Sequence, residues 1–379
     1  MSAVKAQTDL STRPPLHAVP PPAGRRRTLP NRAAYALAAS VIGLGLFASV
    51  TPTPLYHAYS ELWHFSPLTL TLVYATYAFG VLASLLLAGG VSDDVGRRPV
   101  LLVSLGGLIG ATVLFLVADS AAWLFAARAI QGVSTGAALS AASAALLDLH
   151  PRRDPAAAGL ANGIAATAGI GLGILLSSSL VQIGWEPRVL PYALLLVLAL
   201  IALSGVYWMP EPVPGRSRFR LTVQRPRIPP VVRPQFVLAG LAVLSSWSIA
   251  ALFFSLGPQL ALHLFRSTNV IVSGTGIAAL AGSATLAQLL TARTAPWVAA
   301  STGSIALAAG MVMIVVAYGS LSVPAVLAGV LVTHISLQST FEIFGGAVAA
   351  IALLVALEAG RTRPKGRPVP VPTPATARP

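Results

Sequence analysis

Cysteine is absent from this sequence and acidic residues are scarce, with 11 Asp and Glu against 25 Lys and Arg in 379 residues. Without cysteine, disulfide frameworks, thiolate metal sites and cysteine nucleophiles are excluded. Charged residues make up only 9% of the chain and apolar residues 55%, whereas about a quarter of a soluble domain is charged. The composition therefore indicates an integral membrane protein.

Long apolar stretches follow one another through most of the chain. A stretch of roughly 20 apolar residues crosses the hydrocarbon core as a helix. We predict ten such helices, at 33–52, 67–89, 99–118, 121–147, 156–183, 189–209, 235–256, 268–292, 296–317 and 341–359. A further apolar stretch at 321–333 is too short for a span, and we expect it to be re-entrant or the remnant of a helix.

Basic, proline-rich segments divide these helices into two groups. The expected organisation is a disordered basic tail at 1–32, a six-helix bundle at 33–209, a basic linker at 210–234, a shortened bundle of four or five helices at 235–360 and a Pro/Arg-rich tail at 361–379. The predicted fold class is therefore an all-α integral membrane protein made of two bundles, the second incomplete.

The basic residues are distributed unevenly between successive loops. They collect in both tails, in the 90–98 loop and in the linker, and Lys and Arg favour the cytoplasmic side of a membrane. We therefore predict that the N-terminus and the C-terminus are cytoplasmic, which needs an even number of spans. The net charge of +14 is explained by this topology, so the expected partner is the lipid bilayer and not a nucleic acid.

One of these basic loops carries a specific pattern, GGVSDDVGRR at 89–98, directly after the second predicted helix. Gly89, Asp93, Gly96, Arg97 and Arg98 resemble, position by position, the loop between helices two and three of the major facilitator superfamily. The resemblance implies a transporter of two bundles that works by alternating access. It also implies that these five residues form a conformational lock.

In the superfamily the aspartate of this loop lies near the start of the eleventh helix, across the interface between the bundles. A carboxylate beside a helix N-terminus is stabilised by up to about 2 kcal/mol, and Arg97 and Arg98 would hold Asp93 in that place. The eleventh helix is the one that this chain does not contain at full length. We therefore predict that Asp93 keeps contacts with Arg97 or loop amides but lacks a complete partner helix.

The fourth predicted helix contains the stretch LFAARAIQGVSTG. Arg128, Gln131 and Gly132 resemble a second pattern of the superfamily, Arg-x-x-Gln-Gly. An arginine within an apolar helix is costly unless it is paired or faces water, so we predict that Arg128 faces the interior of the first bundle and acts in transport or its coupling. The alternative is that its side chain extends to the outer interface. Gly132 and Gly136 predict close helix packing.

The fifth predicted helix departs from the antiporters of the superfamily. Their Gly-Pro signature has no counterpart in GIAATAGIGLGILLSSS, which contains glycines but no proline. In addition, no acidic residue lies in the middle of a predicted helix, and buried carboxylates are the usual proton carriers. A drug–proton antiporter that exports cations is therefore disfavoured, while proton coupling of another kind stays open.

Neutral and aromatic residues are the remaining candidates for a substrate cavity at mid-depth. Tyr74 and Tyr77 share a face of the second helix, Asn162 lies in the fifth and Trp247 in the seventh. Each has an alternative role in helix packing or at the lipid surface. The substrate is expected to be a small molecule whose identity the sequence leaves open.

The sequence thus favours a monomeric secondary transporter, a permease or an efflux protein, in the inner membrane of a bacterium and without a cofactor. The shortened second bundle leaves a degraded, non-transporting membrane protein as an alternative. A lipid-modifying membrane enzyme is a third class, and it is disfavoured because the chain has no His-x-x-x-His metal pattern and no nucleophile-elbow or phosphate-loop pattern.

Overall fold

The computed structural model describes residues 28–64, 66–88, 90–212, 269–295 and 301–310, with single residues and short stretches between 230 and 299. Every regular element in these ranges is helical. The elements are α1 (Asn31–Val50), η2 (Thr53–Leu55), α2 (Tyr56–Trp63), α3 (Pro67–Ala88), α4 (Val91–Val95), α5 (Arg97–Leu116), α6 (Ala121–Leu149), α7 (Pro155–Ile183), α8 (Leu190–Tyr207) and α10 (Val270–Thr291).

Seven of the described helices are long and apolar enough to cross a membrane: α1, α3, α5, α6, α7, α8 and α10. Their bounds agree closely with the six spans predicted for the first half and with the span predicted at 268–292. The all-helical membrane fold is therefore confirmed. The spans predicted at 235–256, 296–317 and 341–359, and the short stretch at 321–333, lie wholly or partly outside the described residues.

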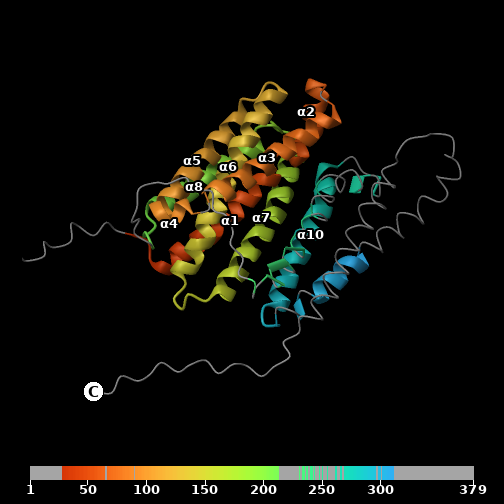
Figure 1. The fold of residues 1–379 in the computed structure, drawn as a ribbon. Helices are drawn as coiled ribbons and strands as arrows, with labels where there is room; N and C mark the ends of the chain where they lie inside the picture. Colours follow the sequence, from red (N-terminus) through yellow and green to blue (C-terminus); the bar gives the residue numbers. More distant parts are fainter. Residues whose placement is uncertain are drawn as a thin grey trace, which may run out of the picture.

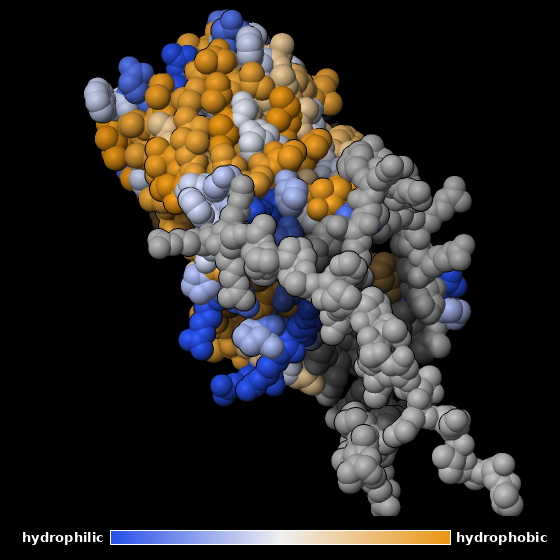
Figure 2. All heavy atoms as spheres, turned by 90° about the vertical axis from the view of Figure 1, so that its left-hand side faces the viewer, coloured by the Kyte–Doolittle hydropathy of each residue, from blue (hydrophilic) through white to orange (hydrophobic). Residues whose placement is uncertain are grey.

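The outer surface of the first bundle is apolar. Figure 2 shows a broad hydrophobic surface between hydrophilic ends. Exposed side chains of α5 and α8 include Val103, Val113, Val197, Leu200 and Ile201. Because water would not favour so large a contiguous apolar surface, these side chains are expected to face lipid.

The first bundle is arranged around α1 and α6 (Figure 1). Helix α6 packs against α1, α3 and α5, while α8 packs mainly on α5. Small residues such as Ala38, Ala141 and Ala142 are fully buried in the core between these helices. In a membrane, helix association depends on such close van der Waals packing, because lipid offers no hydrophobic driving force.

Helix α7 lies between α1 and α10, so it joins the first bundle to the described helix of the second half (Figure 1). Its Gly169 lies so close to α1 that a Cβ there would be 2.1 Å from the carbonyl oxygen of Gly43. On the other face, Thr167 Oγ1 and Thr285 Oγ1 of α10 are 2.6 Å apart. Gly169 therefore serves the close packing of α7 on α1.

Two prolines shape the end of α1. Helix α1 ends at Val50, and the sequence TPTPLY places Pro52 and Pro54 directly after it. Proline has no N–H to continue the helical ladder, so the chain turns through η2 into the short helix α2. This short helix was not predicted, since eight residues with mixed polarity produce no span signal.

Candidate functional site

Arg97, the first residue of α5, is the centre of a polar cluster at one end of the bundle. Its Nε donates to Asp148 Oδ2 at 3.0 Å, and Asp148 lies at the end of α6. Its Nη1 donates to Ser92 Oγ at 2.7 Å and lies 2.5 Å from Asp93 Oδ1. We call Ser92, Asp93, Arg97, Asp148 and Glu211 the loop network.

Glu211 lies in the segment directly after α8 and is the most distant member of this network in the sequence. Its two carboxylate oxygens accept hydrogen bonds from the backbone N–H groups of Arg97 and Arg98, each at 2.9 Å. The first N–H groups of a helix have no partner within the helix, and Gly96 before them has no side chain to supply one. Glu211 therefore caps α5 and adds a negative charge at the positive end of its dipole.

Gly96 is required by the same contact. Its backbone has φ +108° and ψ 156°, a conformation essentially restricted to glycine. A Cβ at this position would also lie 2.9 Å from Glu211 Oε2. The glycine of the loop motif thus lets the Glu211 carboxylate approach the start of α5.

The other residues of the loop motif have different surroundings. Arg98 donates from Nη2 to the carbonyl oxygen of Tyr207 at 2.5 Å, and its guanidinium lies over the Tyr207 ring. The Asp93 side chain is 62% exposed and is close to Arg97. Gly89 and the region of the expected eleventh helix lie outside the described residues. The predicted local contact of Asp93 with Arg97 is present, and its partner across the bundles stays a prediction.

Arg128 is the centre of a second polar cluster, inside the bundle near the α2 end. Its side chain is 0% exposed and does not extend to the interface. Its Nε donates to Tyr56 Oη at 2.6 Å, and its Nη1 donates to Gln131 Oε1 at 2.7 Å and to the carbonyl oxygen of Ser49 at 2.9 Å. We call these four residues, with Ala48, Tyr74, Tyr77 and Phe115, the Arg128 cluster.

The end of α1 explains the two backbone contacts of this cluster. Pro52 has no N–H, so the carbonyl oxygen of Ala48 loses the donor that would continue the helix. Gln131 Nε2 supplies that hydrogen bond instead, at 2.9 Å, and Arg128 serves the next carbonyl, that of Ser49. The prolines after α1 and the Arg-x-x-Gln pattern of α6 therefore form one structural unit.

Aromatic rings enclose the guanidinium group of Arg128. Its Cζ atom lies 5.4 Å from the ring centre of Tyr56, 5.6 Å from Tyr74, 5.2 Å from Tyr77 and 5.9 Å from Phe115. Such cation–π contacts contribute ~0.5 to 2 kcal/mol each, more when the groups are removed from water. Nη2 has no hydrogen-bond partner among the described residues.

Gly132 allows α3 to pack closely against α6 beside the Arg128 cluster. A Cβ at Gly132 would lie 2.4 Å from the carbonyl oxygen of Tyr77, so only glycine permits this separation between α3 and α6. Gly136, one turn later, is equally close to α3, because a Cβ there would lie 2.8 Å from the Val81 carbonyl oxygen. The predicted packing role of both glycines is confirmed, and it sets the position of the Tyr77 ring beside Arg128.

The remaining predicted cavity residues are distributed over several places. Tyr74 and Tyr77 belong to the Arg128 cluster, and the Tyr74 hydroxyl reaches Thr53 Oγ1 at 3.5 Å. Asn162 accepts a hydrogen bond from Ser143 of α6 at 2.9 Å. Trp247 is 55% exposed, and most of its neighbours lie outside the described residues, so its place in a cavity stays a prediction.

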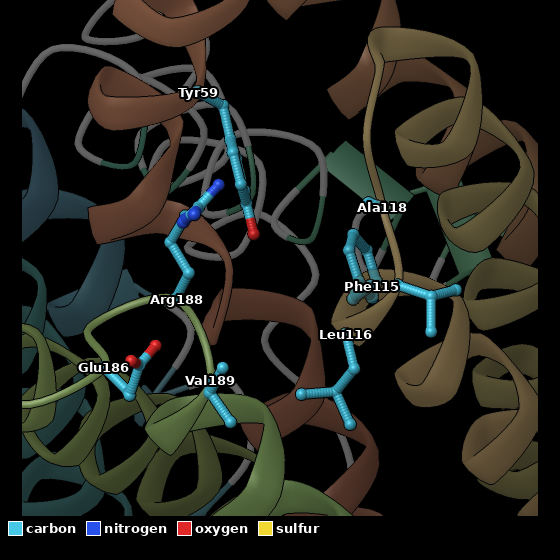
Figure 3. A pocket seen from close by; sticks show the side chains of 8 residues that line it. Tyr59, Phe115, Leu116, Ala118, Glu186, Arg188 and Val189 are labelled. Carbon is cyan, nitrogen blue, oxygen red and sulfur yellow. The ribbon is translucent and has the colours of Figure 1, made fainter.

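A small cavity of about 180 Å³ opens beside Phe115 (Figure 3). It is lined by Tyr59, Phe115, Leu116, Val117, Ala118, Glu186, Arg188 and Val189. Phe115 is shared with the Arg128 cluster. Within the described residues, no group of three His, Cys, Asp or Glu side chains could hold a metal ion.

A family model supplies the decisive comparison. The model of the Major Facilitator Superfamily matches residues 35–365, most of the chain. The chain belongs to the Major Facilitator Superfamily. The loop motif and the Arg-x-x-Gln-Gly pattern both lie within the residues that the family model matches. This match extends through both halves of the chain.

Individual relatives within the superfamily match shorter segments. The chain is 33% identical over 138 residues to Multidrug resistance protein D of Escherichia coli K12, covering 35% of this chain and 33% of that protein. It is 35% identical over 96 residues to Multidrug resistance protein MdtL of Escherichia coli O45:K1, covering 25% of each. The matched segments thus span a third or less of these relatives.

A solved superfamily structure supports the fold over most of the chain. The human organic anion transporter MFSD10 (TETRAN) superposes with a TM-score of 0.59, covering 88% of this chain and 86% of that one at 20% identity. At this identity the likeness concerns the fold. Together with the seven candidate spans, it establishes a multi-pass membrane protein of the superfamily type.

The sequence does not single out three residues of the loop network and the Arg128 cluster, namely Glu211, Asp148 and Tyr56. Glu211 follows the last helix of the first half, Asp148 lies at the end of α6, and neither belongs to a motif. Tyr56 followed the prolines and carried no motif. The scarcity of acidic residues was the available signal for the first two, because acids in such a chain are expected to be paired.

Proposed function

We propose that this protein is a secondary active transporter that carries a small solute across a bacterial inner membrane by alternating access. The observation that carries the proposal is Arg128, a fully buried cation about two turns inside a membrane-spanning helix. Ionisable residues at such places are costly and usually mark solute or ion pathways.

Structural capping alone does not account for a charge at this position. Gln131, a neutral residue, already provides the same kind of hydrogen bond to Ala48 of α1. A neutral side chain at position 128 could serve Ser49 in the same way and would avoid the desolvation of a cation. A charge retained here is best explained by another charge, on a solute or a proton, that reaches it during transport.

The loop network supports the two-state part of the proposal. It connects the start of α5 with the end of α6 and the segment after α8, so these ends move as one unit. The exposed Asp93 carboxylate can accept a second partner from the other bundle when one state forms. We propose that this lock is weak here, because the expected partner helix is not complete in the sequence.

The direction of transport is proposed to be export. Support comes from the two relatives that are named multidrug resistance proteins, although they match over a third of their length or less. The short match makes the substrate range a separate question. No cofactor is required for this mechanism, and we propose a monomer with both termini in the cytoplasm.

Counterflow in proteoliposomes tests the transport activity. Vesicles containing the protein and a high internal concentration of unlabelled solute should accumulate the labelled solute, chosen by a thermal-shift screen across sugars, amino acids, carboxylates, sulfonates and lipophilic cations. A transporter exchanges the solute unchanged, whereas an enzyme alters it. Arg128→Ala should abolish the exchange, and an unchanged rate at equal reconstitution would reject the role of Arg128.

A reporter fusion tests the proposed orientation. Alkaline phosphatase is active only when it is exported, so a fusion after residue 379 should be inactive and a fusion in the loop between α7 and α8 active. Activity of the C-terminal fusion would reject the even number of spans.

A further inference from the structure

Acidic residues are scarce in the described membrane spans. Among the seven spans the sequence contains one acidic residue, Asp148 at the end of α6, and it is engaged by Arg97. Arg128 lies on the same helix about 30 Å away, so Asp148 cannot neutralise it. Within the described part of the chain the Arg128 guanidinium has hydrogen-bond acceptors and aromatic rings around it but no carboxylate.

The three nitrogen atoms of the Arg128 guanidinium group also differ in their hydrogen bonds. An arginine has five N–H donors and no acceptor. Nε and Nη1 use three of them on Tyr56, Ser49 and Gln131, while Nη2 is buried and has no partner among the described residues. A buried donor without an acceptor costs roughly 1 to 3 kcal/mol, and more when it is charged.

We propose that Arg128 is the counter-charge for the solute, and that the solute is an organic anion with a single oxyanion group and an apolar body. The inference rests on the transport activity proposed above and adds the substrate class. An oxygen of a carboxylate or sulfonate would accept from Nη2, and the solute charge would neutralise the guanidinium. Charge-assisted hydrogen bonds of this kind are about twice as strong as neutral ones.

The surroundings of Arg128 determine the apolar body. Four aromatic rings and the buried Val73 side chain lie in its neighbourhood. A small hydrated anion would lose its water without compensation there, whereas an aromatic or alkyl group would bury apolar area against the rings. Cations are disfavoured by the field of Arg128, since like charges in a low-dielectric site repel strongly.

Movement of the rings gives the solute access to Nη2. In the present conformation Arg128 is fully covered, so the solute reaches it when the bundle opens. The Tyr74 ring is held by a weak hydrogen bond, because its hydroxyl reaches Thr53 Oγ1 at 3.5 Å, near the limit of hydrogen-bond length. Its displacement would expose one face of the guanidinium at low cost.

Three permanently charged or neutral probes of nearly equal size test the inference. These are benzenesulfonate, the neutral benzenesulfonamide and the cation phenyltrimethylammonium, applied to the purified full chain in detergent. Equilibrium binding followed by thermal shift should detect benzenesulfonate and give at least about tenfold weaker affinity for the other two. Arg128→Gln should remove the preference for the anion, and Arg128→Lys should keep part of it.

Ser177→Ala is the matched control. Ser177 Oγ donates to the Thr51 carbonyl oxygen at 2.6 Å, so this variant removes another buried hydrogen bond to the end of α1 without changing charge. It should lower stability and keep the anion preference. The inference is overturned if wild-type protein binds the cation or the neutral probe as tightly as benzenesulfonate, or if Arg128→Gln binds benzenesulfonate as wild type does.

Counterflow of labelled benzenesulfonate separates this inference from the proposed function. Charge-selective binding without exchange would reject the transport activity and support the anion site. Exchange of phenyltrimethylammonium in preference to benzenesulfonate would support the transport activity and overturn the anion site.

Discussion

The two arginine clusters of the first bundle solve the same electrostatic problem in different ways. Arg97, at the end of the bundle, has Asp148 and Asp93 as counter-charges. Arg128, in the interior, has oxygens of neutral groups and four aromatic rings. The charge of Arg97 is neutralised and holds the loop network in place, whereas Arg128 has no counter-charge among the described residues, which is the basis of the proposed solute site.

The burial of the two clusters strengthens this contrast. The Arg97 side chain is 10% exposed and its partner Asp148 18%, so water assists the compensated pair. Arg128 is 0% exposed, and the low dielectric increases the cost of its charge. The cation that has no counter-charge among the described residues therefore lies where its charge would have the larger effect on the proposed solute.

The largest effect is expected from Arg97→Ala. The change leaves the Asp148 carboxylate mostly buried without its cation, and removal of one partner of a buried pair costs about 3 to 5 kcal/mol; the partial exposure of this pair places the loss near the lower bound. Unfolding in detergent measures it. The double variant Arg97→Ala/Asp148→Ala should recover part of the loss, and strict additivity would contradict the pairing.

Gly132→Ala should have the next largest effect, and it sharpens the comparison because it acts on the Arg128 cluster without touching its charge. The added methyl group would overlap the Tyr77 carbonyl oxygen, and overpacking of this kind costs about 1 to 3 kcal/mol. The Tyr77 ring should shift away from Arg128. Gly106→Ala is the control, since a Cβ at Gly106 has nothing within 4 Å; equal losses of stability would contradict the close α3–α6 contact.

Gly96→Ala tests the backbone conformation that lets the Glu211 carboxylate reach the start of α5. The conformation at φ +108° is strained for alanine by about 1 to 3 kcal/mol, and the methyl group also displaces the Glu211 carboxylate. We expect a lower melting temperature with unchanged selectivity between benzenesulfonate and benzenesulfonamide. Altered selectivity would show that the two clusters are not independent.

The smallest effect is expected from Glu211→Gln. The amide can accept only one of the two hydrogen bonds from the start of α5, so the loss combines one hydrogen bond, about 0.5 to 1.5 kcal/mol, with the charge–dipole interaction, about 0.3 to 1 kcal/mol. A melting curve in detergent at low ionic strength measures it. Asp94→Asn changes charge in the same loop and should lower the melting temperature less. A larger effect of Asp94→Asn would show that Glu211 is not the residue that caps α5.

The fold was largely predictable because each helix of the first half must be apolar over its own length, a property local to the sequence. The importance of Arg97 and Arg128 was also visible, since a resemblance marked both. Asp93 and Gln131 were available as partners because they lie in the same motifs, whereas the distant partners were not predictable. Glu211 lies more than a hundred residues from Arg97, and Tyr56 is separated from Arg128 by three helices; only helix packing brings these side chains together. The unpredicted role of Pro52 likewise depends on the register between α1 and α6.

The most direct test of the contrast between the clusters is the affinity of Arg128→Gln and of Arg97→Gln for labelled benzenesulfonate, measured side by side on the monodisperse fraction of each variant. We expect the first change to weaken binding about tenfold or more and the second less than about twofold. Equal weakening in both variants, or a larger loss in Arg97→Gln, would contradict the assignment of Arg128 as the cation that the protein reserves for its solute.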